Sequence, residues 1–126
     1  MRMTSLKYCS GQRLLGEAIL FYTQQQLYQV LVEEIDYLES DRRKIRVHLE
    51  EEEEISVYGT LAEMEKMLDP CFCRCSGSAL VNLQNVRKLE RMKFFMRSGK
   101  SVEIGQRYYA EVRQKFCLYV NRRGSR

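Results

Sequence analysis

Three cysteines stand at alternate positions in one short segment, at Cys71, Cys73 and Cys75. Thiolates bind zinc and react with oxidants, so this spacing could serve a metal site or a redox site. Alternation along a strand would place all three thiols on one face, with successive thiols about 7 Å apart. Tetrahedral zinc sites usually pair closely spaced cysteines with a second pair elsewhere, and the chain offers only two further cysteines and one histidine. The spacing therefore favours ordinary thiols over a metal site, with a redox-responsive cysteine as the main alternative.

Few of the other residues are candidates for a catalytic role. The single histidine, His48, falls at an outward position of a predicted strand, and a general base needs a positioned partner. The sequence contains no glycine-rich phosphate loop, no G-x-S-x-G and no H-E-x-x-H. Glu50–Glu54 is an unbroken acidic run, whereas calcium loops alternate carboxylates with turn residues, so we interpret it as a solvated turn. We predict a protein that is not an enzyme and that uses neither a metal nor another cofactor.

Positive charge is concentrated in the second half of the chain. Residues 64–126 carry 14 Lys and Arg against 5 Asp and Glu, whereas residues 1–63 carry 7 against 12. The halves therefore have net charges of +9 and −5, which together give the +4 of the whole chain. A field of one sign on part of a small domain attracts a polyanion, because phosphate contacts gain affinity from counterion release. Composition alone does not separate DNA from RNA.

Basic side chains cluster in two places that could face a nucleic acid. Arg42, Arg43 and Lys44 lie in a connection between predicted strands, where a side chain can reach into a groove that a sheet cannot enter. A solubilising loop would have the same composition. Further basic residues recur between apolar segments later in the chain, and some of them are ordinary surface charge. These are Arg87, Lys88, Arg91, Lys93, Arg97 and Lys100.

The chain has 126 residues, the size of one domain with its own core. It has no apolar run of signal-peptide length and no stretch near the ~20 apolar residues needed to span a bilayer. Its five cysteines are an odd number, which argues against a secreted disulfide framework and agrees with a reducing compartment. We expect a cytoplasmic protein without a membrane segment.

Hydrophobic periodicity predicts a mainly β domain at residues 18–120, after a poorly ordered lead-in or linker remnant at 1–17 and before a basic tail at 121–126. A capping box that begins at Thr60 starts a short helix, and a second short helix covers about 107–120. The predicted strands are 18–22, 27–32, 35–38, 44–49, 54–58, 72–75, 79–81, 86–90, 92–97 and 101–104.

In chain order, several segments resemble the LytTR DNA-binding domain. They are Ile35–Ser40 (IDYLES), Tyr58–Leu61 (YGTL), Phe72–Asn82 (FCRCSGSALVN), Val86–Glu90 (VRKLE) and Gly105–Tyr109 (GQRYY). The most specific part is the F-x-R-x-x-x-S-x-x-V-N core, with I-x-Y-L-E-S before it and G-x-R-Y after it at the family's spacing. The match covers about residues 18–120.

The resemblance implies a fold of stacked small β-sheets, an elongated sandwich, whose loops enter successive major grooves of duplex DNA. Domains of this family usually serve as output domains of bacterial transcription regulators and bind two direct repeats as a pair. The expected partners are therefore duplex DNA and a second copy of the chain. Family members commonly carry an N-terminal receiver domain or a membrane segment, and we find neither in these 126 residues.

The family's base-reading positions can be carried over onto this sequence. The arginine after the last strand corresponds to Arg107, and in the loop after I-x-Y-L-E-S the residues Arg42, Arg43 and Lys44 remain equal candidates. A third position, often Asn or Arg in the family, falls on Gly77, which has no side chain. We expect contacts to the DNA backbone from Arg74, Ser76, Ser78, Asn82, Arg91 and Lys93.

The competing hypothesis is a protein-interaction or thiol-responsive module that does not bind DNA. In that case the three cysteines would matter and the arginines would not. The two hypotheses differ in one geometric expectation. Arg107 and the loop at 42–44 share one convex face if the chain binds DNA, and they are dispersed otherwise.

Overall fold

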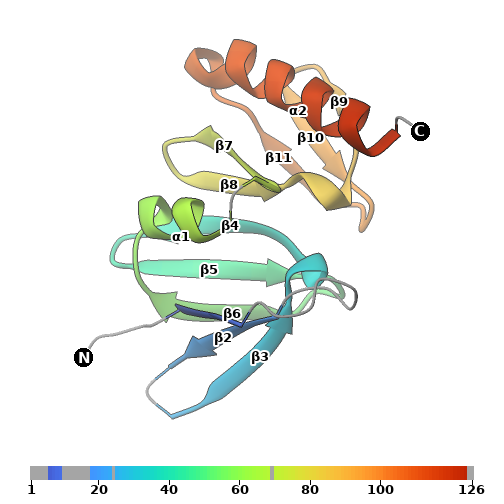
Figure 1. Ribbon diagram of the computed structural model, residues 1–126. Helices are drawn as coiled ribbons and strands as arrows, with labels where there is room; N and C mark the ends of the chain where they lie inside the picture. Colours follow the sequence, from blue (N-terminus) through green and yellow to red (C-terminus); the bar gives the residue numbers. More distant parts are fainter. Residues whose placement is uncertain (1–5, 10–17, 24, 69, 125–126) are drawn as a thin grey trace.

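The computed structural model describes residues 6–9, 18–23, 25–68 and 70–124, which form three β-sheets and two α-helices (Figure 1). The central sheet has five strands in the order β6-β5-β4-β8-β7, and all neighbouring strands in it are antiparallel. The strands are β4 (Ile35–Asp41), β5 (Lys44–Leu49), β6 (Glu54–Tyr58), β7 (Phe72–Ser76) and β8 (Ala79–Asn82). Strands β4 and β8 are adjacent in the sheet although they are far apart in the chain.

Two smaller sheets of three strands each flank the central sheet (Figure 1). They consist of β1 (Leu6–Cys9), β2 (Ala18–Tyr22) and β3 (Leu27–Leu31), and of β9 (Val86–Glu90), β10 (Lys93–Met96) and β11 (Ser101–Glu103). The helices are α1 (Leu61–Leu68) and α2 (Tyr109–Gly124), with 3-10 turns at η2 (Val32–Glu34), η3 (Leu83–Asn85) and η4 (Gln106–Tyr108). The predicted mainly β stack of small sheets is confirmed.

The two faces of the central sheet contribute to different cores. The first core joins the central sheet to β2, β3 and α1, and it includes Leu38 and Ile45. The second core joins β7 and β8 to the β9–β11 sheet and α2, and it includes Val81, Phe94 and Val112. Side chains alternate between the faces of a strand, so β8, whose four residues are all buried, contributes to both cores.

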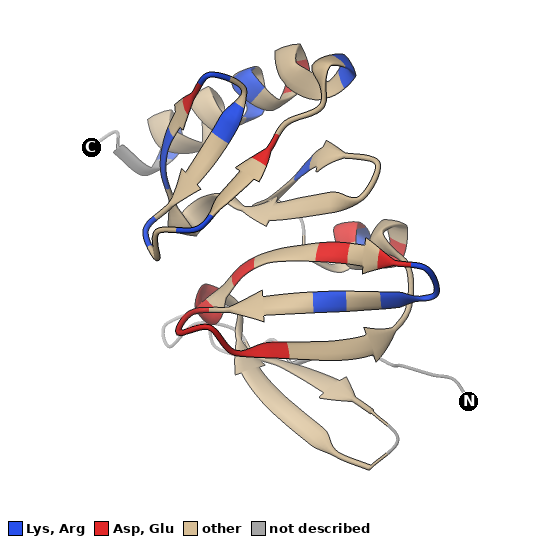
Figure 2. Cartoon of the chain, turned by 180° about the vertical axis from the view of Figure 1, so that it is seen from behind, with Lys and Arg blue, Asp and Glu red and all other residues tan. Residues whose placement is uncertain are grey.

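The part of the central sheet formed by β4, β5 and β6 leaves one polar face open (Figure 2). On this face the rings of Tyr37 and His48 stack at 4.3 Å, and Nε2 of His48 lies 2.9 Å from Oε1 of Glu39. Arg46 lies within 3.9 Å of three carboxylates on the same face. The outward position of His48 that alternation predicts is confirmed, and the ring is held by its neighbours on the sheet.

Polar side chains attach the β9–β11 sheet to the central sheet. Asp36 is 1 % exposed, and its Oδ2 accepts a hydrogen bond of 2.7 Å from the hydroxyl of Ser98. Nζ of Lys100 lies 3.7 Å from the same oxygen and donates a hydrogen bond of 2.9 Å to the carbonyl of Leu49. A buried carboxylate without partners would be costly. These contacts therefore anchor the turn between β10 and β11 beside the start of β4 and the end of β5.

Both predicted helices are present. The capping box of α1 is confirmed, because the amide of Thr60 donates to Oε1 of Glu63 at 3.1 Å and the amide of Glu63 donates to Oγ1 of Thr60 at 3.2 Å. In α2, the ring of Phe116 packs edge-on against Phe94 with centroids 5.3 Å apart. Helix α2 extends to Gly124, so most of the expected basic tail is helical. Within the described residues, neither helix is long and apolar enough to cross a membrane.

Several strand ends differ by one residue from the sequence-based expectation, and two differences are larger. Residues 6–9, expected in the lead-in, form β1, in which Leu6 pairs with Phe21 and Cys9 pairs with Ala18. Strand β4 extends to Asp41 because its polar residues after Leu38 still pair with β5. Polar residues on an open sheet face do not end a strand, and apolar periodicity alone cannot show this.

Candidate nucleic-acid interface

Three connections lie at one edge of the molecule, at the left in Figure 1 and at the right in Figure 2. They are the β4–β5 turn, the β7–β8 turn and the connection from β11 to η4. The middle turn is bonded to both neighbours, because the amide of Ser40 donates to the carbonyl of Ser78 at 3.0 Å and the amide of Gly105 donates to the carbonyl of Cys75 at 2.8 Å. We call residues 41–44, 76–78 and 105–107 the three-loop edge.

The β4–β5 turn presents two arginines. Asp41 pairs with Lys44, so the turn consists of Arg42 and Arg43 alone. Arg42 has a φ of 64°, a left-handed conformation that glycine adopts more readily than arginine. Both arginines are exposed, and within the described part of the chain neither has an ion-pair partner. The amide of Gly59 donates to the carbonyl of Arg43 at 3.2 Å and ties the turn to the end of β6.

Lys44 and Arg46 are engaged on the open sheet face instead. Nζ of Lys44 lies 5.3 Å from the ring centre of Tyr58, a cation–π contact. Arg46 is surrounded by the carboxylates described above. The sequence left Arg42, Arg43 and Lys44 as equal candidates, and the structure separates Lys44 from the two arginines at the tip of the turn.

Arg74 shapes the β7–β8 turn from within the protein. Its Nη1 donates to Oε1 of Glu65 at 2.8 Å, and its Nε donates to the carbonyl of Ser76 at 3.1 Å. Its Nη2 donates to the carbonyl of Gly77 at 3.3 Å. The guanidinium therefore holds α1 and the turn together, a role that differs from the expected direct contact with the DNA backbone.

The tip of the β7–β8 turn is open to solvent. The amide of Ser78 donates to Oγ of Ser76 at 3.1 Å, and Gly77 and Ser78 are exposed. A Cβ atom built on Gly77 would have no heavy atom within 4 Å, and its φ lies outside the left-handed range. A side chain at this position would therefore fit, and the glycine is not required by the local backbone.

Asn82 does not face solvent. It is 0 % exposed, and its Nδ2 donates to the carbonyls of Val32 at 3.1 Å and Ile35 at 2.8 Å. Its Oδ1 accepts a hydrogen bond of 3.0 Å from the amide of Gln84. Asn85 donates to the carbonyl of Ile35 in the same way. The side chain of Asn82 therefore fixes η2 instead of facing solvent, and the expected contact of Asn82 with the DNA backbone stays a prediction.

Arg107 lies at the other end of the three-loop edge. It is the second residue of η4, is exposed, and has no ion-pair partner among the described residues. Tyr108 and Tyr109, which follow it, pack against the second core. A Cβ atom on Gly105 would lie 3.4 Å from Cδ1 of Tyr108 and 3.6 Å from the carbonyl of Cys75, which are ordinary contact distances, so the packing here does not require glycine.

Arg91 and Lys93 belong to the β9–β10 hairpin, whose turn adjoins the β11–η4 connection, because the amide of Ile104 donates to the carbonyl of Met92 at 2.9 Å. Lys93 pairs with Glu90 and Glu103 across the outer face of the sheet. Arg91 has a φ of 51° in the turn, followed by Met92 with a φ of 63°. These two basic residues therefore lie on a hairpin that borders the Arg107 end of the three-loop edge.

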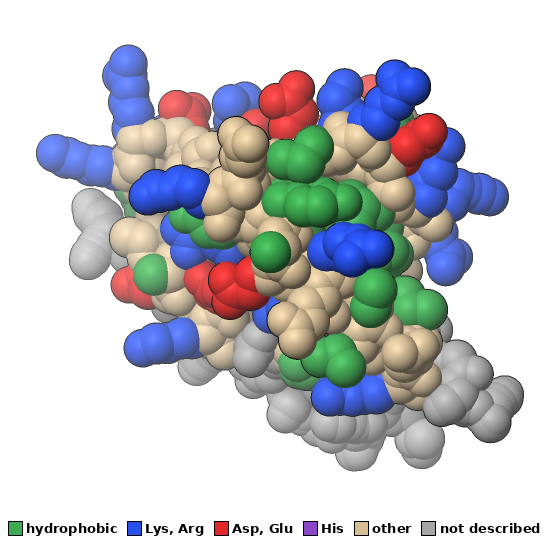
Figure 3. All heavy atoms as spheres, turned by 90° about the horizontal axis from the view of Figure 1, so that it is seen from above, with side chains coloured by type: hydrophobic (Ala, Val, Ile, Leu, Met, Phe, Trp, Pro, Cys, Tyr) green, Lys and Arg blue, Asp and Glu red, His purple; other side chains and the backbone are tan. Residues whose placement is uncertain are grey.

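Basic side chains are not confined to one face of the molecule. Viewed from above, Lys and Arg side chains occur at both ends of the surface that α2 covers, with apolar side chains between them (Figure 3). Leu118 and Val120 of α2 are 53 % and 46 % exposed. The excess of positive charge in residues 64–126 therefore does not by itself define an interface, whereas the three-loop edge brings arginines from both halves of the chain together.

The three cysteines are divided between the two cores. Cys73 and Cys75 are buried in the second core, and Cys71 precedes β7 and packs against the first core. The expectation that all three thiols share a face is therefore wrong for Cys71, because β7 begins at Phe72. Among the described residues, no group of three or more Cys, His, Asp or Glu side chains is arranged to hold a metal ion.

Comparison with known proteins gives one family and one fold. Residues 25–116 match the model of the LytTr DNA-binding domain. Among solved structures, the fold is similar to the LytTr DNA-binding domain of a Bacillus cereus protein described as a response regulator, with a TM-score of 0.67 and 25 % identity over 78 % of this chain and 94 % of that one. Among curated proteins, none is significantly similar in sequence. The match of the family model over most of the chain shows that this protein belongs to the LytTR DNA-binding domain family.

Proposed function

We propose that this chain recognises specific duplex DNA sequences in bacterial transcription regulation and does so through the three-loop edge. The observation that carries the proposal is the hydrogen bonding of the β7–β8 turn to both neighbouring connections. This bonding holds the arginines of the β4–β5 turn and Arg107 at one edge, separated by the middle turn. The competing hypothesis of a module that does not bind DNA gives no reason for such an arrangement.

The arginines have the properties required for reading bases. Arg42, Arg43 and Arg107 are exposed and have no carboxylate partner among the described residues. A free guanidinium can donate two hydrogen bonds to O6 and N7 of guanine in the major groove. In this proposal Arg107 reads one groove, and Arg42 with Arg43 reads the next.

The β7–β8 turn would face the DNA between these two sites, where it contacts the backbone because Gly77 has no side chain to reach a base. Ser76 and Ser78 supply hydroxyls, and Gly77 leaves the backbone of the turn accessible. Such contacts fix the register of the protein on the duplex without specifying sequence. Arg91 and Lys93, on the hairpin that is bonded to the end of β11, would add further contacts to the DNA backbone beside Arg107.

The wider biological setting is part of the same proposal. Two copies of the chain would bind direct repeats side by side, each using its own three-loop edge. Such a domain would act in the cytoplasm as the output part of a regulator and would carry out no catalysis. A receiver domain would be a suitable source of the input signal.

A selection of bound fragments from random duplex DNA tests the proposal. We expect an enriched motif that occurs as a direct repeat. On that site, the logarithm of the binding constant should fall against the logarithm of salt concentration with a slope of roughly −4 to −8, for about 5–9 neutralised phosphates. Absence of any enriched motif, together with a flat salt response, would overturn the proposal.

A further inference from the structure

Cys73 and Cys75 lie close together beside the three-loop edge. The pairing of β7 with β8 shifts between Arg74 and Ser76, so Cys75 occupies an irregularity of the strand. Both thiols are in the second core, and Sγ of Cys75 donates to the carbonyl of Cys73 at 3.6 Å. Sγ of Cys73 donates to the carbonyl of Arg74 at 3.9 Å, and each thiol shifts the pKa of the other. The two cysteines are therefore close neighbours in one core, at an irregular point of β7.

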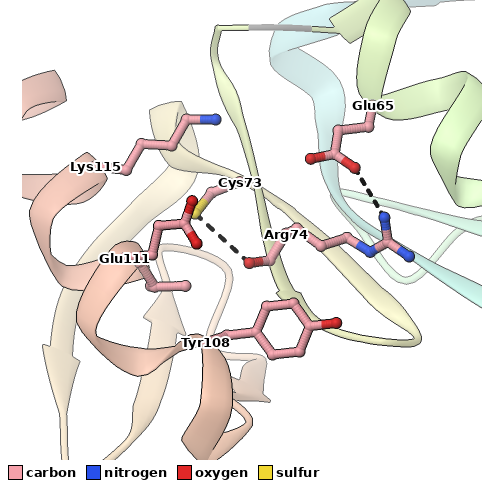
Figure 4. Close-up of a pocket in the computed structure, with 7 residues that line it drawn as sticks. Glu65, Cys73, Arg74, Tyr108, Glu111 and Lys115 are labelled. Atoms are coloured by element: carbon pink, nitrogen blue, oxygen red, sulfur yellow. Dashed lines mark hydrogen bonds and ion pairs between the residues drawn. The ribbon is translucent and has the colours of Figure 1, made fainter.

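Only one of the two thiols lines a pocket that opens to the surface. The pocket has a volume of about 280 Å³ and lies between α1, β7 and the start of α2 (Figure 4). Its lining includes Cys73, Tyr108, Glu111 and Lys115, but Cys75 is not part of it. Of the two thiols, the one at the wall of this pocket is therefore Cys73, which is 2 % exposed.

The surroundings of the two thiols make them chemically unequal. The hydrogen bond from the Cys75 thiol lowers the pKa of Cys73, and the ammonium of Lys115 lowers it further, against the opposing effect of burial. The hydrogen bond to Cys73 and burial raise the pKa of Cys75. The thiolate is the nucleophilic form of cysteine. These directions, together with the place of Cys73 at the pocket wall, favour Cys73 as the thiolate and keep the proton on Cys75.

We propose that Cys73 and Cys75 form a dithiol site that is oxidised by a small disulfide bound in the pocket, and that the resulting Cys73–Cys75 disulfide disturbs the three-loop edge. In the first step the Cys73 thiolate attacks one sulfur of the small disulfide, the S–S bond breaks, and one small thiol leaves with a proton. Cys73 is then joined to the remaining half in a mixed disulfide. The hydrogen bond to the Cys73 thiolate, and its charge, then no longer raise the pKa of Cys75.

In the second step Cys75 loses its proton and attacks Sγ of Cys73. The mixed disulfide breaks, and the second small thiol leaves with that proton. Two protein thiols have become one disulfide, and one small disulfide has become two thiols, so electrons and protons balance. Cys71 and Cys117 take no part, because Cys71 packs against the other core and Cys117 is exposed on α2.

The backbone permits this bond only with a local change. Residues two apart in a regular strand have Cα atoms about 6.6 Å apart, near the upper limit of the roughly 4.4–6.8 Å found in disulfides. The irregular pairing at Cys75 already departs from a regular strand, and closing the disulfide would bend this point further. The change would move the carbonyl of Cys75, which accepts the hydrogen bond from Gly105.

The consequence for DNA binding rests on the proposed function. Gly105 precedes Arg107 by two residues, and its hydrogen bond to Cys75 joins η4 to the β7–β8 turn. Loss of this bond would release Arg107 from its fixed position relative to the other two loops. The oxidised protein should therefore bind its selected DNA site about tenfold more weakly, as expected when one bidentate base contact is lost.

The test uses the full chain with Cys9, Cys71 and Cys117 replaced by serine, so that only the pair remains. Bis(2-hydroxyethyl) disulfide is the probe, and intact mass with peptide mapping follows the reaction. We expect a transient adduct on Cys73, then a product lighter than the reduced chain by two hydrogens, and reversal by a reductant. With Cys75→Ser, the adduct on Cys73 should persist. With Cys73→Ser, an adduct on Cys75 should form much more slowly than the adduct on Cys73 does.

The readouts separate this proposal from the proposed function. Amide hydrogen exchange at Gly105 should become faster after oxidation, whether or not the chain binds DNA, and binding to the selected duplex should weaken. If the reduced chain binds no duplex, the proposed function fails, and the mass and exchange data still judge the dithiol site. An adduct that forms first on Cys75, no internal disulfide in the folded unsubstituted chain, or unchanged exchange at Gly105 after disulfide formation would overturn the dithiol proposal.

Discussion

The two ends of the central sheet have similar turns but opposite charge. At the three-loop edge, Arg42 has a φ of 64° in the β4–β5 turn, and at the other end Glu51 and Glu52 have φ values of 68° and 69° in the β5–β6 turn. Burial, and then the negative charge of Asp36, raise the pKa of Glu50 at the acidic end. Both ends hold charged residues in conformations that favour glycine, so charge rather than backbone preference distinguishes them.

The cations at the two ends also differ in their partners. At the acidic end, Lys100 is held by Asp36 and by the carbonyl of Leu49. At the three-loop edge, Arg42 and Arg43 have no such partners among the described residues. A cation that is already paired must lose that contact before it can bind a phosphate or a base. The availability of the guanidinium, rather than the number of basic residues, therefore marks the interface.

Charge reversal at the two ends of the central sheet should produce the largest difference in DNA affinity between two variants. Arg42→Glu with Arg43→Glu should weaken binding to the selected site about 100-fold or more, because two contacts worth about 1–3 kcal/mol each are lost. The matched change at the acidic end, Glu51→Arg with Glu52→Arg, adds positive charge away from the DNA and should change affinity much less. Titrations at one fixed salt concentration measure both. Similar affinities of the two variants would contradict the assignment of the three-loop edge.

Removal of a single arginine should have a smaller and more selective effect. Arg107→Ala should lose about 1–3 kcal/mol on the selected site and much less on random duplex DNA, since it removes a base contact. Arg97 lies in the β10–β11 turn at the other end, so Arg97→Ala should change both affinities equally and slightly. Thermal melts would check that both variants fold. Equal losses on the two DNAs for a folded Arg107→Ala would reject its base-reading role.

The sequence predicted local structure better than the roles of single polar residues. Alternation identified β5, and the capping box identified the start of α1, because both signals are local. The pairing of β4 with β8 depends on residues about forty positions apart, and no local pattern shows it. Asn82 and Arg74 illustrate the same limit at the site. Both belong to the motif that identifies the family, yet Asn82 is buried and Arg74 holds the β7–β8 turn. The type of a polar residue does not show whether it supports a loop or contacts DNA.

A side chain added at Gly77 should increase the affinity of the three-loop edge for DNA. The position is open and its backbone accepts other residues. Gly77→Asn should therefore leave the fold intact and increase affinity by about 1 kcal/mol for duplexes that place adenine opposite the turn, through a bidentate contact. Gly77→Ala is the control, because it adds no hydrogen-bonding group. A repeated selection with Gly77→Asn would reveal the new base preference, and an unchanged motif would mean that the turn does not enter a groove.

The smallest expected effect concerns the strained turn residues themselves. Glycine adopts left-handed φ values without steric cost, so Arg42→Gly and Glu51→Gly should each stabilise the fold by about 0.5–1 kcal/mol, a rise in Tm of roughly 2–4 °C. The two gains should be alike because the φ values are 64° and 68°. Only Arg42→Gly should weaken binding to the selected site, since only that substitution removes a side chain at the three-loop edge. Thermal melts and DNA titrations on the same preparations separate the two effects. A lower Tm for Arg42→Gly would contradict the idea that the left-handed conformation of Arg42 costs stability. A loss of affinity for Glu51→Gly would contradict the idea that only Arg42 contacts DNA.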